Sequence, residues 1–239
     1  MMLWRRRFST SIANPALCFI HPSAKVDPSA TLSPYCVVQA NAIIHENCKI
    51  GAGTVVGENV VLGSDSDIGS QVTLEHCVVG KRTVVHTGTR IGQDGFGFVL
   101  DASGNHAKKP QTLLVEIQDD VEIGSVSLFV GVRTDSCQGT KMDNLIQIGH
   151  NVHLGRNCII AAQTGIAGST TVGANVHIGG QVGIAQHLTI GDNVRIAAKS
   201  GVMHHLAANS TFGGTPAVPI MEYRRLMAFL RDAGRKQQK

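Results

Sequence analysis

The sequence has few aromatic and few charged residues, both of which most helical and α/β domains need. Aromatic residues make up only 4% of the 239 residues and charged residues only 16%, whereas glycine occurs 27 times. The layers of a helical bundle or a Rossmann domain usually need larger side chains inside and more charge outside. The composition instead favours a narrow interior filled by β-branched and small side chains. No apolar run approaches the roughly 20 residues that a bilayer-spanning helix needs, so the sequence predicts no transmembrane segment.

The six cysteines do not form a metal-binding or disulfide pattern. No C-x-x-C pair is present, and no cysteine has a histidine partner at zinc-ligand spacing. Cys36, Cys48 and Cys158 instead fall at positions of a six-residue repeat that take small residues. We therefore expect buried, reduced thiols and no metal site.

The first twenty residues differ in composition from the rest of the chain. They contain three arginines, Arg5 to Arg7, and three hydroxyl residues, Ser9 to Ser11, and the first carboxylate of the chain is Asp27. Such a segment is typical of an organellar transit peptide, so residues 1–19 are predicted to direct the protein to a mitochondrion, or alternatively to a plastid. A basic tail without a targeting role is the other interpretation. The net charge of the whole sequence is +4, and three of its positive charges belong to residues 1–19. The charge therefore indicates no nucleic-acid partner.

Apolar residues recur every six positions along most of the chain. Ten consecutive positions of this series are all Ile, Val or Leu: Ile20, Val26, Leu32, Val38, Ile44, Ile50, Val56, Leu62, Ile68 and Leu74. If these residue types fill about a quarter of an average chain, ten matches arise by chance on the order of once in a million. After a one-residue slip the series resumes at Val79, and a second series runs from Ile148 to Val202.

Each repeat also has a small or β-branched residue four positions after the large one, and glycine often follows the large one directly. A period of six is a multiple of the two-residue period of a strand but not of the 3.6-residue period of a helix. It therefore predicts short parallel strands that turn a corner once per hexad, with three hexads in each triangular coil. The predicted fold class is all-β, a left-handed parallel β-helix of hexapeptide repeats over residues 20–214.

Three segments depart from this period. Residues 93–112 have no repeat and are rich in polar turn residues, which predicts a loop inserted at one corner. Residues 125–140 match the hexad poorly. From Pro219 onward, apolar residues recur at spacings of three and four, so residues 215–239 are predicted to form an amphipathic C-terminal α-helix and a basic tail.

One histidine has the position expected of a proton acceptor. His150 follows the inward residue Ile148 by two positions, so its side chain is expected to lie away from the interior fill. A neutral imidazole there could take a proton from an attacking amine or hydroxyl group. A carboxylate or a backbone carbonyl would fix its tautomer, and Asp143, about one face back along the coil, is the candidate carboxylate. A histidine on a sheet surface is nevertheless more often structural than catalytic.

Three blocks of the sequence resemble one enzyme family. They are Ile20-His21-Pro22-Ser23-Ala24, the loop from Ile91 to Phe98 with Lys109-Pro110-Gln111, and Asp143-Asn144 followed by Gln147 to Asn151. These blocks are similar to segments of the UDP-3-O-acylglucosamine N-acyltransferases of lipid A biosynthesis, which are hexapeptide-repeat acyltransferases. In that family a uridine-binding domain precedes the β-helix. Because few residues precede Ile20, the resemblance implies an organellar form that lacks this domain.

The resemblance also implies a reaction. A (3-hydroxy)acyl chain would move from the 4'-phosphopantetheine arm of acyl carrier protein to the 2-amino group of UDP-3-O-acylglucosamine, and the chain itself would hold no cofactor. His150 would act as the general base, and the backbone N–H of Gly168 would stabilise the oxyanion. His187 would lie near the phosphates and the thioester arm, and Gln147 and Asn151 would contact the substrate.

The resemblance implies a carrier-binding surface and an assembly. Arg224, Arg225 and Arg231 belong to the predicted C-terminal helix, which in the family's trimer lies close to where the acidic carrier docks. These arginines are therefore predicted to bind acyl carrier protein, with a solvated helix face as the alternative. The flat faces of the prism and the helix, which needs an apolar partner, predict a homotrimer.

Two other functions stay open at the level of the sequence. A non-catalytic hexapeptide scaffold would fit the irregular residues 125–140 and the expected lack of a uridine-binding domain. A γ-type carbonic anhydrase would fit the fold and the compartment, but its zinc site needs two histidines five residues apart on one face. No histidine pair in this sequence has that spacing.

Overall fold

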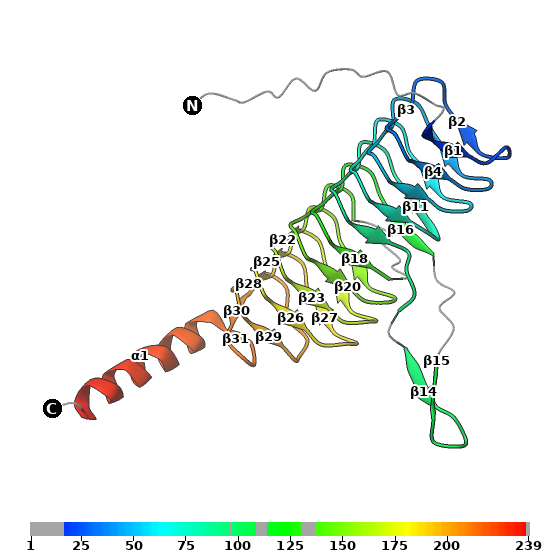
Figure 1. Ribbon diagram of the computed structural model, residues 1–239. Coiled ribbons are helices and arrows are strands. Elements are labelled where there is room, and N and C mark those ends of the chain that lie inside the picture. Colours follow the sequence, from blue (N-terminus) through cyan, green and yellow to red (C-terminus); the bar gives the residue numbers. More distant parts are fainter. Residues whose placement is uncertain (1–16, 96, 109–113, 131–136, 238–239) are drawn as a thin grey trace, which may run out of the picture.

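The computed structural model describes residues 17–95, 97–108, 114–130 and 137–237. It shows a left-handed parallel β-helix, a three-sided prism of stacked coils, followed by a long helix (Figure 1). The predicted fold class is therefore confirmed. Residues 1–16 of the predicted transit peptide lie outside the described residues. Within the described ranges, no helix combines the length and the apolar character needed to cross a membrane.

The prism has three faces, and the coils contribute one strand to each face in turn. In the described residues, face 1 consists of β1 (Phe19–Ile20), β4 (Val37–Val38), β7 (Val55–Val56), β10 (Thr73–Leu74), β13 (Arg90–Ile91), β18 (Leu128–Phe129), β20 (Gln147–Ile148), β23 (Gly165–Ile166), β26 (Gly183–Ile184) and β29 (Gly201–Val202). Face 2 consists of β2 (Lys25–Val26), β5 (Ile43–Ile44), β8 (Val61–Leu62), β11 (Cys77–Val79) and β16 (Val115–Ile117), and then of β21 (His153–Leu154), β24 (Thr171–Val172) and β27 (Thr189–Ile190). Face 3 consists of β3 (Thr31–Leu32), β6 (Lys49–Ile50), β9 (Asp67–Ile68), β12 (Val84–Val85), β17 (Glu122–Ile123), β19 (Lys141–Met142), β22 (Ile159–Ile160), β25 (His177–Ile178), β28 (Arg195–Ile196), β30 (Thr211–Gly213) and β31 (Val218–Pro219).

Along a face, strands of successive coils pair in parallel. Val38 pairs with Val56 and Val56 pairs with Leu74, so the same repeat position stacks on itself along a face. Parallel strands of this kind lie about 4.8 Å apart. The coil between Leu62 and Val79 is one residue shorter than the coils before it, because Val79 pairs with Leu62. This shorter coil is the structural counterpart of the slip in the sequence.

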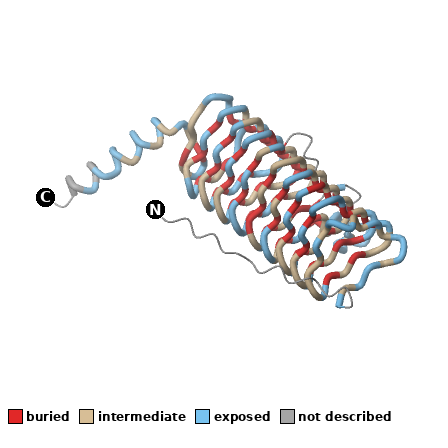
Figure 2. Tube along the Cα trace, turned by 90° about the horizontal axis from the view of Figure 1, so that it is seen from above, coloured by how far each residue is buried: buried red, intermediate tan, exposed pale blue. Residues whose placement is uncertain are grey.

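From β4 to β29 the large residue of each described hexad is buried, and buried positions recur from coil to coil (Figure 2). Ile44, Leu62 and Ile148 have no more than 1% of their surface exposed. The small residues are buried as well, and their polar atoms bond to the backbone. For example, the hydroxyl of Thr54 donates to the carbonyl of Gly69 at 2.7 Å. The prism therefore buries its polar side chains without leaving them unpaired.

Cysteines lie in the same narrow interior. Cys36 and Cys77 are almost completely buried. Burial raises the pKa of the Cys36 thiol to about 11 and that of the Cys77 thiol to about 12. Because a thiolate is the reactive form, thiols with raised pKa values react slowly at neutral pH.

Each coil turns its corners through residues in the left-handed backbone region. Asn175 and Asn193, with φ values of +57° and +58°, occupy the same corner in successive coils. Asparagine tolerates this conformation better than most residues. The Asn175 amide donates to Asn193 at 3.1 Å, and the Asn193 amide donates to Asn209 at 2.8 Å. Such ladders hold the coils in register from the outside, as the large residues do from the inside.

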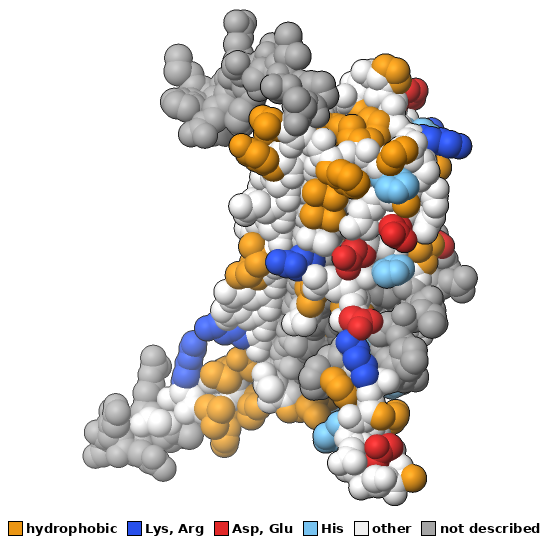
Figure 3. Space-filling model, turned by 45° about the vertical axis from the view of Figure 1, so that its right-hand side comes forward, with side chains coloured by type: hydrophobic (Ala, Val, Ile, Leu, Met, Phe, Trp, Pro, Cys, Tyr) orange, Lys and Arg blue, Asp and Glu red, His pale blue; other side chains and the backbone are white. Residues whose placement is uncertain are grey.

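The predicted inserted loop contains an antiparallel hairpin. Strands β14 (Phe98–Leu100) and β15 (His106–Lys108) pair with each other and stand clear of the prism (Figures 1 and 3). Residues 96 and 109–113 lie outside the described residues, and so do residues 131–136 of the stretch that matches the hexad poorly. The coil continues in register beyond the hairpin, since Val79 pairs with Ile117.

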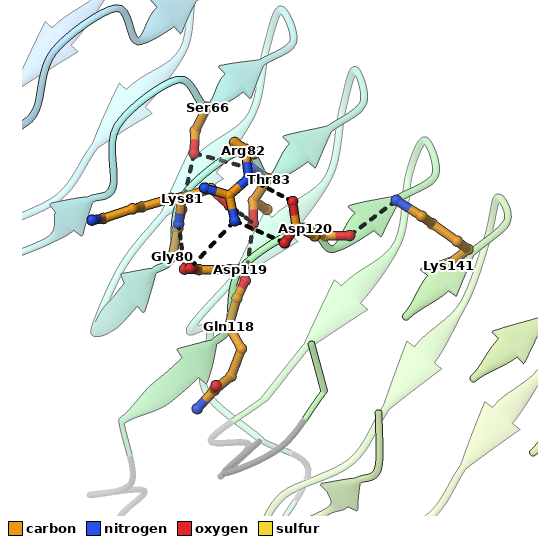
Figure 4. Close-up of polar contacts among 9 residues, drawn as sticks. All are labelled: Ser66, Gly80, Lys81, Arg82, Thr83, Gln118, Asp119, Asp120 and Lys141. Atoms are coloured by element: carbon orange, nitrogen blue, oxygen red, sulfur yellow. Dashed lines mark hydrogen bonds and ion pairs between the residues drawn. The ribbon is translucent and has the colours of Figure 1, made fainter. Parts of the chain in front are cut away.

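Ionic contacts join the two coils on either side of the hairpin (Figure 4). The Arg82 guanidinium donates two hydrogen bonds to the carboxylate of Asp120, at 2.7 and 2.8 Å, across 38 residues of sequence. The Lys81 N–H donates to Asp119 at 2.8 Å, and Lys141 Nζ donates to the Asp120 carbonyl at 2.9 Å. The hydrogen bonds from Arg82 lower the pKa of the Asp120 carboxyl group. These contacts add to the backbone hydrogen bonds between the two coils, such as that from the Gly80 N–H to the Ile117 carbonyl at 2.8 Å.

Helix α1 (Ile220–Gln237) lies within the predicted segment 215–239. It begins only at Ile220, because β31 first pairs antiparallel with β30. Ile220 and Tyr223 pack against Gly213 and Gly214, and the rest of the helix projects away from the prism (Figure 1). The helix leaves large apolar side chains exposed, namely Met221, Leu226, Phe229 and Leu230.

The alternation of inward and outward residues predicts a large loss of stability at one of two neighbouring isoleucines and almost none at the other. Ile160 is 1% exposed and Ile159, the preceding residue of β22, is 50% exposed. We expect Ile160→Ala to lower the free energy of unfolding by about 2–5 kcal/mol, because it leaves a cavity in the interior. The matched variant Ile159→Ala should change it by no more than about 0.5 kcal/mol. Urea denaturation followed by circular dichroism measures both, and equal losses would contradict the assignment of inward and outward positions.

Candidate active site

A cleft with a volume of about 640 Å³ runs along face 1 over the C-terminal coils. Residues of β20, β23, β26 and β29 line it, together with Gly95 at the base of the hairpin and Val130 after β18. Most of its lining is glycine or apolar. The polar side chains in the lining are those of Gln147, His150 and Gln186.

The cleft exists because the outward positions of three strands are glycine. Gly165, Gly183 and Gly201 are in register with one another, at the position that carries Val37 and Val55 on the N-terminal coils of the same face. A Cβ added at Gly165 or Gly183 would meet no atom within 4 Å. Gly165 and Gly183 therefore do not relieve a crowded backbone, whereas a Cβ at Gly201 would meet Thr215 Cγ2 at 3.1 Å. The three glycines hollow the face and leave an apolar groove that suits an extended chain.

The side chain of His150 leans over the next coil. His150 is half-buried at the corner after β20, and Gly168 holds the same corner position one coil further on. A Cβ added at Gly168 would come within 2.7 Å of both ring nitrogens of His150, so the imidazole occupies the space that a side chain there would need. The backbone also links the two coils, because the Ser169 N–H donates to the His150 carbonyl at 2.8 Å.

Gly168 places an available N–H group beside the imidazole. Its carbonyl accepts a hydrogen bond from the His187 N–H at 3.1 Å, whereas its own N–H donates to no acceptor among the described residues. A ring nitrogen that can take a proton and an N–H that can stabilise a negative oxygen are the two groups that acyl transfer requires. The cleft brings both groups together with an apolar groove.

The other predicted substrate-binding residues divide into two sets. Gln147 lines the cleft with His150 and Gly168. Asn151 and His187 occupy the left-handed corner position, with φ values of +53° and +60°, and neither belongs to the lining. The amide of Asn151 donates to the Ser169 hydroxyl at 3.3 Å, and the side chain of His187 is exposed.

Asp143 lies in a different cleft from His150. It lines a second cleft of about 530 Å³ on face 3, together with His86, Glu122 and Lys141. One carboxylate oxygen of Asp143 accepts the Asn144 N–H at 2.7 Å. The strand β20 separates the corner of Asp143 from that of His150. Within one chain, the structure therefore does not bring this predicted pair together.

The predicted carrier-binding arginines form a surface apart from the cleft. Arg224, Arg225 and Arg231 are exposed on α1, and none of them belongs to the cleft lining. Helix α1 projects away from the prism (Figure 1), which separates the arginines from His150 within one chain. In the ranges that the structure describes, no group of three or more His, Cys, Asp and Glu side chains is placed to hold a metal ion.

The structure adds residues that the sequence analysis did not identify. Gly165, Gly183 and Gly201 recur at intervals of one coil, and this recurrence could have indicated a hollow in face 1. Gln186 follows Gly168 at the same interval and could have been found in the same way. Gly95 could not, because the path of the inserted segment does not follow from a repeat.

The family model described as bacterial transferase hexapeptide (six repeats) matches residues 41–76 and 169–204. A UDP-3-O-acylglucosamine N-acyltransferase of a Methylobacterium species is 44% identical over 162 residues, which cover 66% of this chain and 46% of that protein. An Arabidopsis thaliana protein named "probable UDP-3-O-acylglucosamine N-acyltransferase 2, mitochondrial" is 41% identical over 169 residues, which cover 70% of this chain and 56% of that protein. The chain thus spans about half the length of the curated relatives that it matches.

A solved structure confirms the architecture. The UDP-N-acetylglucosamine acyltransferase of Bacteroides fragilis aligns with a TM-score of 0.57 and 20% sequence identity, over 87% of this chain and 77% of that one. At this identity the likeness shows a shared fold.

The contact between His150 and Gly168 predicts a local rearrangement on substitution. In Gly168→Ala the new Cβ would overlap the imidazole, so we expect the His150 side chain to rotate out of its position while the coils stay in register. The matched variant Gly183→Ala adds a Cβ in open space of the same cleft and should leave His150 in place. Crystal structures of the two variants would show this. An unchanged imidazole in Gly168→Ala would contradict the proposed crowding.

Proposed function

This chain is a hexapeptide-repeat β-helix and a relative of UDP-3-O-acylglucosamine N-acyltransferases, and we propose that it is itself an N-acyltransferase of lipid A-type biosynthesis. The observation that carries the proposal is the cleft in which the His150 ring, the Gly168 N–H and an apolar groove meet. The acceptor is UDP-3-O-acylglucosamine, as the names of the relatives indicate. The donor is an acyl thioester on the 4'-phosphopantetheine arm of acyl carrier protein.

The geometry supports the following course of reaction. The 2-amino group of the sugar attacks the thioester carbon while His150 takes a proton from the amine. The carbonyl electrons move to oxygen, and the Gly168 N–H stabilises the negative charge that develops there. The carbonyl then re-forms, the carbon–sulfur bond breaks, and the proton held by His150 passes to the leaving thiolate. The products are an amide and the free thiol of the carrier arm.

The remaining site residues have binding roles in this proposal. The groove over Gly165, Gly183 and Gly201 receives an acyl chain, since its lining is apolar. Gln147 contacts the substrate inside the cleft. Asn151 and His187 contact it at the rim, with His187 near the phosphates and the thioester arm.

The active assembly is proposed to be a homotrimer. The exposed apolar side chains of α1 need a partner, and closed three-fold symmetry would supply it. Asp143 could orient the His150 ring only from a neighbouring copy, since the two residues line different clefts in one chain. A mitochondrial location is proposed because one relative carries this designation and because the basic residues Arg5 to Arg7 are typical of a transit peptide.

The central test is acyl transfer by the purified protein from acyl-carrier protein to UDP-3-O-acylglucosamine. We expect turnover by the wild type and a loss of roughly 10²-fold or more in kcat for His150→Ala, because that variant lacks the general base. His187→Ala should raise KM more than it lowers kcat. Near wild-type turnover by His150→Ala would refute the assignment of the base. A wild-type protein that folds and assembles but transfers no acyl group would favour a non-catalytic scaffold.

The arginines of α1 predict a donor-specific effect. Arg224 and Arg225 offer positive charge to an acidic carrier, so the double change to glutamate should raise KM for acyl-carrier protein, most strongly at low salt. The KM for a small acyl-pantetheine donor should not change, because that donor has no acidic surface. Light scattering on the same variant checks the predicted trimer. Equal losses with both donors, accompanied by a smaller mass, would show that the arginines support assembly and not the carrier.

A further inference from the structure

Gln186 is the polar side chain of the cleft lining that the proposed mechanism leaves without a role. Ile148 pairs with Ile166 and Ile166 pairs with Ile184. His150, Gly168 and Gln186, each two residues further along, therefore hold the same corner position in three successive coils. All three line the cleft.

The absence of a side chain at Gly168 leaves a gap in this column. The imidazole of His150 enters the gap from one coil, and Gln186 borders it from the other. From the strand spacing, the backbone of Gln186 lies about 5 Å from that of Gly168, which is within reach of its own carboxamide. The reacting oxygen of a ligand that bonds to the Gly168 N–H would lie next to the imidazole, at the corner that Gln186 also borders.

The side chain of Gln186 is also available. It is exposed, and it makes no hydrogen bond within the described part of the chain. Gln181 and Gln163 of the same prism are, in contrast, bonded to each other, since Gln181 Nε2 donates to Gln163 Oε1 at 2.6 Å. A carboxamide carries two N–H donors and neither gains nor loses a proton near neutral pH, so it can bind an oxyanion without competing with His150 for the proton.

We propose that Gln186 is a second oxyanion donor, whose Nε2–H binds the thioester oxygen together with the Gly168 N–H. The inference rests on the proposed acyl transfer. When the amine attacks, the carbonyl electron pair moves to oxygen, and the two N–H groups bind the oxygen while His150 holds the proton of the amine. When the carbonyl re-forms, the thiolate leaves and receives that proton, and both hydrogen bonds return to their ground-state strength. Two donors stabilise the charge more than one does, and they act only as the charge develops.

Gln186→Met tests the proposal, because methionine has a similar length and no N–H donor. We expect kcat to fall at least about 10-fold, toward the loss seen when one oxyanion donor is removed, with KM for both substrates nearly unchanged. Gln181→Met is the matched control, as it alters an exposed glutamine of the same prism outside the cleft lining, and it should keep wild-type kcat.

A binding measurement separates this proposal from the proposed function. The probe is an acyl-pantetheine analogue in which a phosphonate replaces the thioester carbonyl, so that it carries an anionic oxygen where the oxyanion would form. Calorimetry should show binding by the wild type and by Gln181→Met, and binding about 10-fold weaker by Gln186→Met. If the wild type turns over no substrate, the acyl-transfer function fails, and the phosphonate still decides whether Gln186 is a donor. Equal phosphonate affinity of Gln186→Met and the wild type, or a rise in KM without a fall in kcat, would overturn the proposal.

Discussion

The way in which each coil turns its corners is the constraint on which the rest of the structure depends. A corner needs a residue in the left-handed backbone region, which costs roughly 1–2 kcal/mol for a residue with a Cβ. Hydrogen bonds between coils offset this cost. The Asn193 N–H donates to the Ala174 carbonyl at 2.9 Å, and the Asn175 amide donates to the Asn193 side chain. Once the corners are stacked, inward residues such as Ile148 and Ile166 stack too, and the interior is filled mainly by aliphatic side chains, with Phe129 as a buried aromatic one.

The same register produces the candidate site. Stacked corners convert residues one coil apart in sequence into neighbours in space, and this places the His150 ring over the backbone of Gly168. Any side chain at residue 168 would displace the imidazole. The glycine is thus explained by contact with the histidine and not by an unusual backbone angle. His150 and Gly168 belong to different coils, so their contact depends on the register between those coils.

The cleft shows a balance between stability and function. On the N-terminal coils the outward positions of face 1 carry Val37 and Val55, which favour strands. On the C-terminal coils the same positions are glycine at Gly165, Gly183 and Gly201. A glycine in a strand is less stable than alanine by roughly 0.5–1 kcal/mol. The groove is therefore formed at some cost in local stability, and the contacts of the neighbouring coils and corners compensate for it.

The sequence by itself determined the fold class and the outward direction of His150. A six-residue period is compatible with a strand and not with a helix, and it repeats too often to arise by chance. The period also indicated which residue types stack, because every coil follows the same rule. Only the tertiary structure decided what lies beside His150. It placed Asp143 in another cleft, Gln186 in the same one and Gly95 at its border. A sequence period predicts the face and the coil on which a residue lies. The contacts between side chains of different coils depend in addition on how the corners turn, where an insertion leaves the prism and which volumes are left empty.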